Sequence, residues 1–233
     1  MPDSDVAAAF SRHEPWITKY ELRGASSGGW FDATNDHRIE QFRSCFPAAK
    51  RILELGALEG GHTIGLGRLP GVEYVLGVEG RAKNLARARL AQELYEIPNI
   101  EFIEANLEQN RLAEFGPFDV IYCSGLLYHL PEPWKLVEQF AAVAPGLFIW
   151  THCTGEVDAD YLVEGYRGRR YAEGGPDEVL SGLSPDSFWP TLGSLCTMLT
   201  THGFAEVRLL DNNAAHPHGP AVTMAAFAGL VRP

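Results

Sequence analysis

The fold is decided by residues 51–63, which read RILELGALEGGHT. The apolar run at 51–55 is typical of a buried strand, and it passes through a glycine-rich turn into a helix. Gly56 and Gly60 allow the main chain to approach a ligand where side chains would clash. The segment predicts a ligand-binding turn in an α/β protein, although glycines at these positions can also serve only to pack a helix on a strand.

Two acidic residues accompany this turn. Glu54 lies just before it, where a carboxylate suits a ligand's ammonium group and would sit badly beside a pyrophosphate. Glu79 ends the next predicted strand, where a carboxylate can accept hydrogen bonds from both hydroxyls of a ribose. The alternative for Glu79 is an exposed acid at a strand end. Together the acids predict a ligand that combines an amine with a nucleoside sugar.

The rest of the chain alternates short β-rich runs with segments of helical periodicity, which indicates a sheet covered by helices on both faces. A helix is predicted over 85–95 from its apolar stripe. The loop at 212–220 is too short for a helical crossover, so the last two strands should pair antiparallel. We expect a mainly parallel, seven-stranded α/β fold that ends in an antiparallel hairpin. Its strands are predicted at 51–55, 74–79, 100–104, 118–123, 146–151, 205–210 and 221–230.

One further helix is predicted from local end signals. Ser184 followed by Pro185 indicates a capping residue and a first helical turn. The helix would carry Leu195 and Leu199 inward and stop at Gly203.

The length and apolar content favour one domain over residues 1–233. The first thirty or so residues look irregular, and residues 1–47 are expected to form an N-terminal cap. Residues 152–183 are rich in glycine, tyrosine and charge, and a stretch of this length without periodicity predicts a lid that closes over a ligand.

The pattern Glu54-x-Gly56-x-x-x-Gly60, followed by Glu79 and Asn106, resembles motifs I to III of the class I S-adenosylmethionine (SAM)-dependent methyltransferases. The resemblance covers roughly residues 51–151. It implies a Rossmann-like fold and SAM as the cofactor. By this resemblance the glycine turn and its preceding acid meet the methionine portion, and Glu79 meets the ribose.

The resemblance also implies that Asn106, with the backbone of Leu107, meets the adenine. Two positions depart from the family pattern. Leu58 stands where the family has the middle glycine of the turn, and Asn106 stands where it usually has aspartate. An asparagine oxygen can still accept from the exocyclic amine of adenine.

Residues 118–131, FDVIYCSGLLYHLP, are similar to the segment that ends against the sulfonium in the same enzymes. The stretch from Leu127 to Trp134 resembles the L-Y-H-x-x-x-P-W pattern of small-molecule methyltransferases and of the tRNA wobble-uridine carboxymethyltransferase. Ser124 is the expected cofactor contact here and Tyr128 a substrate contact, although a turn residue and a core aromatic are the alternatives.

His129 and His152 are the candidate catalytic residues. Each follows a strand expected to end at the cofactor, and imidazole titrates near neutral pH, as a general base must. Both could instead be hydrogen-bonded core histidines. Methyl transfer also proceeds by positioning alone when the acceptor is already nucleophilic.

Arg167, Arg169 and Arg170 form the densest basic cluster and lie within the predicted lid. Guanidinium groups there could hold a carboxylate, phosphate or sulfate of the substrate. The alternative is a solvated turn.

Composition excludes several classes. Nineteen basic against thirty acidic residues give a formal charge of −11, which argues against nucleic acid, including tRNA, as a substrate. No run resembles a signal peptide or membrane span, so a cytoplasmic location is expected. The four cysteines are widely spaced, and His216 and His218 lack an identifiable carboxylate partner, so no metal site is expected.

We therefore expect a SAM-dependent methyltransferase that acts on oxygen or nitrogen of a small, possibly anionic metabolite. An alternative keeps the fold but catalyses another displacement, such as ring closure or elimination of an anionic leaving group. A third is an accessory subunit of a biosynthetic complex. The acceptor and the oligomeric state, possibly a homodimer, are not disclosed by the sequence.

Overall fold

The computed structural model describes residues 3–229 of the chain. It divides into two compact units, Met1–Ala105 and Asn106–Pro233, which are described separately. The predicted seven-stranded, mainly parallel sheet with a C-terminal antiparallel hairpin is confirmed. Three of its strands belong to the first unit and four to the second.

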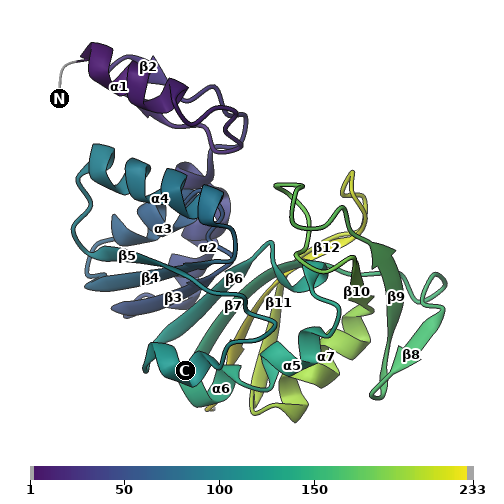
Figure 1. Ribbon diagram of the computed structural model, residues 1–233. Coiled ribbons are helices and arrows are strands. Elements are labelled where there is room, and N and C mark those ends of the chain that lie inside the picture. The colour runs from purple at the N-terminus through teal and green to yellow at the C-terminus, as the bar shows by residue number, and fades with distance from the viewer. Residues whose placement is uncertain (1–2, 230–233) are drawn as a thin grey trace. The chain divides into compact units, whose positions relative to one another are not determined.

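The strands of the first unit run parallel to one another and match their predicted bounds. They are β3 (Arg51–Leu55), β4 (Tyr74–Glu79) and β5 (Ile100–Glu104). The apolar residues of β3 and β4 are buried on both faces, which explains their continuous hydrophobic runs. Helices α3 (Gly61–Gly67) and α4 (Ala82–Tyr95) pack against this sheet, as Figure 1 shows. The predicted helix at 85–95 is thus confirmed.

The N-terminal part of the first unit is more regular than expected. It contains α1 (Asp3–Ser11), β1 (Glu21–Leu22), β2 (Ala25–Ser26), η1 (Ala33–Asn35) and α2 (His37–Cys45). The prediction that the first thirty or so residues are irregular was wrong because α1 is supported by tertiary contacts, whereas the role of residues 1–47 as a cap stays a prediction. Phe10 lies against Trp16 with ring centroids 5.6 Å apart, and the Trp16 indole donates to the Phe10 carbonyl.

A buried ion pair ties this N-terminal part to the glycine turn. Glu59 and Arg87 are 0% and 1% exposed, and their carboxylate oxygen and guanidinium nitrogen lie 3.0 Å apart. The Glu59 carboxylate also accepts the backbone N–H groups of Ile17 and Thr18. Arg87 Nε donates to the His13 carbonyl. One charge pair therefore joins α4, the turn and the segment after α1.

Arg87→Met should lower the free energy of unfolding by about 3–5 kcal/mol, because it leaves the Glu59 carboxylate buried without its cation. The matched control is Lys50→Met, which breaks the exposed pair between Lys50 and Glu73 and should cost less than about 1 kcal/mol. Urea unfolding of the three proteins measures both effects. Equal losses of unfolding free energy in the two variants would contradict the role of Arg87 as the buried partner of Glu59.

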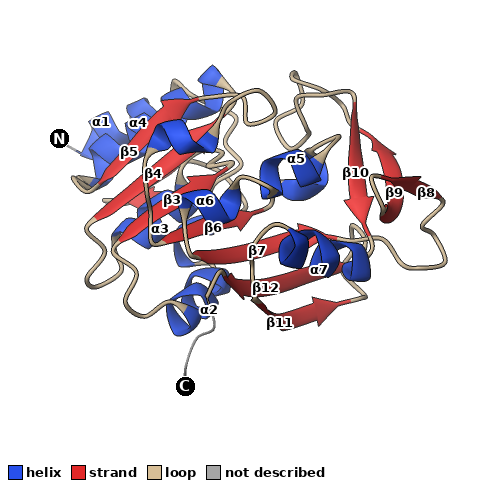
Figure 2. Ribbon diagram, turned by 90° about the horizontal axis from the view of Figure 1, so that it is seen from below, coloured by secondary structure: helices blue, strands red, loops and turns tan. Residues whose placement is uncertain are grey.

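The second unit holds the remaining four strands of the main sheet. They are β6 (Val120–Ser124), β7 (Gly146–His152), β11 (Glu206–Asn213) and β12 (Ala221–Phe227). β6 and β7 are parallel, and β12 pairs antiparallel with both β7 and β11 (Figure 2). The predicted hairpin of the last two strands is confirmed. The short helices α5 (Pro133–Val137) and α6 (Phe140–Val143) and the 3-10 turns η2 (Leu112–Phe115) and η3 (Leu127–His129) complete the connections.

A second, antiparallel sheet replaces part of the helix predicted from Ser184. It consists of β8 (Tyr161–Val163), β9 (Tyr166–Ala172) and β10 (Asp186–Pro190). The helix, α7 (Leu192–Thr201), begins only after Thr191, whose side chain caps it by accepting from the Ser194 N–H. The prediction failed because pairing with β9, distant in sequence, overrides the local cap signal. That residues 152–183 close over a ligand stays a prediction.

Three absences concern residues 3–229 alone. No helix in that range has the length and hydropathy needed to cross a bilayer. No group of three or more histidine, cysteine or acidic side chains there could hold a metal ion. None of the four cysteines, all within that range, forms a disulfide.

Candidate functional site

The turn after β3 repeatedly takes left-handed backbone conformations. Gly56, Leu58 and Gly60 have φ angles of +78°, +52° and +83°. A side chain in this region costs roughly 1 kcal/mol or more, which explains why a glycine would be easier at position 58. Leu58 is held there because its N–H donates to Glu79 Oε2 at 2.8 Å. The departure from a glycine pattern therefore leaves the shape of the turn intact.

Glu54 is a buried acid at the start of this turn. Its residue is 1% exposed, and one carboxylate oxygen accepts the hydroxyl of Thr63. Burial raises the pKa of Glu54 to about 8. The hydrogen bond from Thr63 lowers the pKa and so opposes this increase, whereas the neighbouring charge of Glu79 adds to it. Near neutral pH the carboxyl of Glu54 therefore holds its proton in the ligand-free protein.

Glu79 lies at the end of β4 and is buried as well. Its carboxylate accepts the N–H groups of Leu58 and Arg81 and the side-chain amide of Asn84, the last at 3.3 Å. Burial raises its pKa, and these hydrogen bonds oppose the increase. Each carboxylate oxygen has two lone pairs, so the contacts orient Glu79 and leave it able to accept from a ligand.

His62 stands between Glu54 and a second acid, Asp36. Its Nε2 lies 3.2 Å from Asp36 Oδ2, and its Nδ1 lies 3.8 Å from Glu54 Oε1. Burial lowers the pKa of His62, so the ring is neutral at pH 7. Burial alone would raise the pKa of Asp36, but hydrogen bonds from His62 and Arg38 outweigh it and hold the pKa well below its usual range. The positive charge of this network, that of Arg38, is thus paired with Asp36.

Glu54 consequently lacks a positively charged partner. Among residues 3–229, no lysine or arginine forms an ion pair with it, and its histidine neighbour is neutral. A buried carboxyl of this kind is stabilised as an anion when a ligand brings an ammonium group. Glu79, one strand away, fits a sugar diol. The residues present therefore fit a ligand with an amine and a ribose.

Gly60 has a packing role in addition to its place in the turn. A Cβ atom there would lie 2.7 Å from the ring of Phe102 and 3.0 Å from the Cβ of Ala88. The close approach of α4 and β5 to the turn thus requires glycine at this position. Gly60 therefore allows close packing, which was the alternative drawn from the sequence, and it also takes the left-handed φ that the turn needs.

In the second unit, aromatic and histidine side chains gather at the ends of β6 and β7. The ring of Tyr128 lies 4.1 Å from that of His129 and 4.6 Å from that of His152, between centroids. His152 stacks on Trp189 at 4.9 Å with the planes 9° apart. The structure therefore brings the two candidate bases and Tyr128 together. Trp189, on β10, was missed because its strand was predicted to be helix.

The two histidines are held by different acceptors. His152 Nδ1 lies 3.0 Å from the Gly219 carbonyl, and burial lowers the pKa of the ring. His129 Nδ1 lies 3.1 and 3.2 Å from the two carboxylate oxygens of Glu173. Glu173 was also missed, because nothing in the local sequence around it indicates a partner 44 positions away.

A family model described as a methyltransferase domain matches residues 53–146. The N-terminal domain of EvdMO1, solved in the presence of SAH and D-fucose, is 34% identical with a TM-score of 0.88, and the match covers 98% of each chain. The chain belongs to the class I SAM-dependent methyltransferases. SAM, the cofactor expected from the sequence, is the cofactor of this family.

Other relatives of this methyltransferase are more distant or longer. Ubiquinone biosynthesis O-methyltransferases from Albidiferax ferrireducens and Acinetobacter baylyi are 28% and 26% identical over 52% and 63% of the chain. The chain spans 52% and 64% of their lengths. It covers 48% of complete EvdMO1, at 32% identity and a TM-score of 0.78.

The remaining cofactor contacts predicted for the methyltransferase lie in the second unit. Asn106 Oδ1 accepts the N–H of Glu108 at 2.9 Å, which makes it a turn residue as well as a candidate adenine contact. Leu107 is buried, and Ser124 is buried at the end of β6. Their contacts with a cofactor stay predictions.

The three arginines of the predicted anion site do not point the same way. They alternate along β9, which places Arg167 and Arg169 on one face and Arg170 on the other. Arg167 pairs with Glu156 at 3.1 Å, and Arg170 pairs with Asp186 at 2.8 Å. Recognition of an anion by this cluster stays a prediction.

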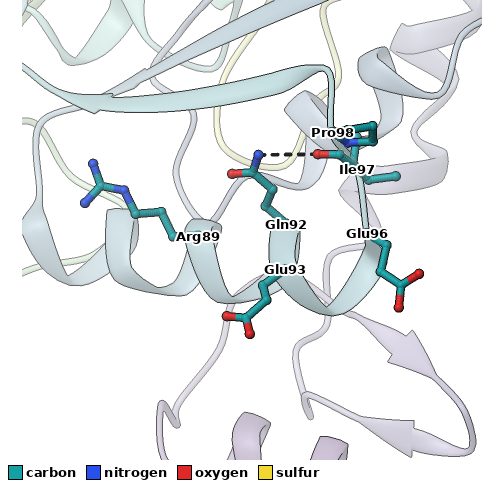
Figure 3. A pocket seen from close by; sticks show the side chains of 6 residues that line it. All are labelled: Arg89, Gln92, Glu93, Glu96, Ile97 and Pro98. Atoms are coloured by element: carbon teal, nitrogen blue, oxygen red, sulfur yellow. Dashed lines mark hydrogen bonds between the residues drawn. The ribbon is translucent and has the colours of Figure 1, made fainter. Parts of the chain in front are cut away.

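A shallow pocket elsewhere in the methyltransferase is not part of this site. It lies over the last turns of α4 and the residues that follow before β5, and Figure 3 shows the side chains that line it. The side-chain amide of Gln92, in its wall, donates to the carbonyls of Ile97 and Ile100. Its lining consists of Arg89, Gln92, Glu93, Glu96, Ile97 and Pro98.

Glu54→Gln should change how the stability of the ligand-free methyltransferase depends on pH. The native state keeps the Glu54 proton to about pH 8, whereas the unfolded chain loses it near pH 4.5, so this residue lowers the free energy of unfolding as pH rises between those values. The variant should match the wild type near pH 5 and exceed it by on the order of a few kcal/mol near pH 8.

Urea unfolding at a series of pH values measures this difference. Glu101→Gln is the control, because Glu101 is exposed and should leave the pH dependence unchanged. A constant difference between Glu54→Gln and the wild type across the range would show that the carboxyl is not shifted.

Proposed function

We propose that this chain transfers the methyl group of SAM to a hydroxyl oxygen of a small, neutral, polar metabolite. The observation that carries the proposal is the buried, cation-deficient Glu54 beside the turn that Glu79 holds. The curated relatives are named O-methyltransferases, which supports oxygen as the acceptor atom.

The residues of the first unit bind and orient the cofactor. Glu54 accepts the ammonium group of its amino-acid end, and Glu79 accepts the ribose hydroxyls. When bound, SAM supplies an electrophilic methyl group on a sulfonium sulfur. The rate gain then comes mainly from holding the acceptor oxygen in line with that methyl group.

The residues of the second unit suit a hydroxylated ring as the acceptor. Tyr128 and Trp150 supply aromatic surface for the apolar face of such a ring, and the imidazole of His129 can accept from one of its hydroxyls. The pairing of Arg167 and Arg170 with carboxylates favours a neutral acceptor over an anionic one. The EvdMO1 domain was solved in the presence of D-fucose, so deoxyhexoses are the first acceptors to test.

Incubation with SAM labelled in the methyl group should yield a labelled methyl ether of a compound in a panel of deoxyhexoses and catechols. Glu79→Gln should raise the KM for SAM about 10- to 100-fold, since it removes a charged acceptor of ribose hydrogen bonds. Glu101→Gln, an exposed acid at the start of β5, should leave the KM unchanged.

Labelled product is separated by chromatography and located by mass spectrometry. Methylation at nitrogen or carbon alone would contradict the choice of oxygen. A wild-type KM in Glu79→Gln would contradict the assignment of the ribose contact.

A further inference from the structure

Glu173 is a buried carboxylate at the end of β9 that collects hydrogen-bond donors from three separate segments. Its side chain is 3% exposed. Ser187 donates to Oε1 at 2.6 Å, while Ser181 and the N–H of Gly182 donate to Oε2 at 2.6 Å each. Burial opposes ionisation, but these bonds and the one from His129 outweigh it and lower the pKa of Glu173 to about 2. The group is a fixed anion at neutral pH.

This anion determines which nitrogen of His129 carries the proton. His129 Nδ1 lies within hydrogen-bond distance of both Glu173 oxygens, and an ionised carboxylate can only accept. Nδ1 must therefore be the protonated nitrogen, which leaves the lone pair on Nε2. No residue between 3 and 229 forms a hydrogen bond with that Nε2, and the side chain is 17% exposed. The ring thus presents a free acceptor.

His152 does not offer the same chemistry. Its Nδ1 is directed to the carbonyls of Gly219 and Pro220, which are neutral, and its ring is buried against Trp189. A histidine that acts as a base becomes an imidazolium when it takes a proton. A buried imidazolium needs an anion beside it. Of the two histidines, His129 alone has a carboxylate within hydrogen-bond distance among residues 3–229.

We propose that His129 is the general base for methyl transfer and that Glu173 is the positioning residue that sets its tautomer. The inference rests on the proposed function. As the acceptor oxygen forms its bond to the methyl carbon, the bond from that carbon to sulfur breaks and its electron pair stays on sulfur. The hydroxyl proton passes to His129 Nε2. The imidazolium formed is neutralised by Glu173 until it releases its proton to water.

The tautomer of His129 tests this dyad without any substrate. In protein labelled with ¹⁵N in the histidine rings, spectra at about pH 8 should show the His129 proton on Nδ1, with signals assigned by their loss in His129→Asn. Glu173→Ala should shift the proton toward Nε2, whereas His152 in the same spectrum should keep its Nδ1–H form. A proton on Nε2 of His129 in the wild type would overturn the proposal, even if the variant does not fold.

Kinetics provide the second test once an acceptor is found. His129→Asn should lower kcat about 100-fold or more, and Glu173→Ala about 10- to 100-fold, with the KM for SAM unchanged in both. Glu132→Ala is the control, because it removes a partly exposed carboxylate of the same unit that pairs with Lys135 and has no part in the site. It should keep kcat within about twofold of the wild type.

The outcomes separate the two proposals. Methyl transfer by Glu173→Ala at the wild-type kcat would overturn the dyad and leave the proposed function standing. A wild type that binds SAM but methylates no acceptor, yet holds the His129 proton on Nδ1, would overturn the proposed function and with it the role of His129 as base, and would leave only the tautomer set by Glu173. A loss of kcat in Glu173→Ala without a shift of the His129 proton toward Nε2 would mean that the carboxylate only supports its loop, and it would overturn the dyad.

Discussion

The hydrogen bond from the Leu58 N–H to the Glu79 carboxylate is the constraint on which the site depends. It joins the end of β4 to the turn after β3 and keeps a non-glycine residue in a left-handed conformation. With Gly56 and Gly60 in similar conformations, the turn stays half-exposed at Gly56 and Leu58, beside the two acids. The same carboxylate is therefore both a structural support and the candidate ribose acceptor. This double role explains why its neighbours Arg81 and Asn84 also donate to it.

The central strands of the main sheet, β3, β4, β6, β7 and β12, could be predicted because they are buried on both faces and read as short, mainly apolar runs. The helix start at Ser184 could not, because residues 186–190 are ordered by β9, and such pairing leaves no local trace. The left-handed conformation of Leu58 could not be predicted either, because only the structure shows that this leucine takes the conformation expected of glycine. Its effect on the fold is small because Glu79 compensates for it.

The candidate acids were visible from the sequence, while their environment was not. Glu54 and Glu79 follow directly from their places at strand ends. The neutral state of His62, which leaves Glu54 without a cation, comes from burial of the ring, and it persists although Asp36, just before α2, raises the pKa of that ring. Glu173 likewise acts through partners in separate loops, so no spacing rule could identify it. Buried charge is thus where sequence analysis is weakest and where the structure adds most.

The two units use buried carboxylates in opposite ways. In the first, Glu54 has too few donors, holds its proton and awaits a charged ligand. In the second, Glu173 is saturated with donors and stays ionised without any ligand. The first arrangement suits binding, because a ligand supplies what the fold lacks. The second suits proton transfer, because the anion is already in place when a neighbouring imidazole becomes charged.

The central claim is that Glu54 receives the ammonium group of a nucleoside-linked amino acid, and proton release on binding tests it most directly. Calorimetric titration with SAH at about pH 7, in buffers of different ionisation enthalpy, counts the protons exchanged. Because Glu54 is protonated in the free protein and ionised beside an ammonium group, about one proton should leave for each SAH bound, and none in Glu54→Gln. Binding without proton release, or no binding, would contradict the claim.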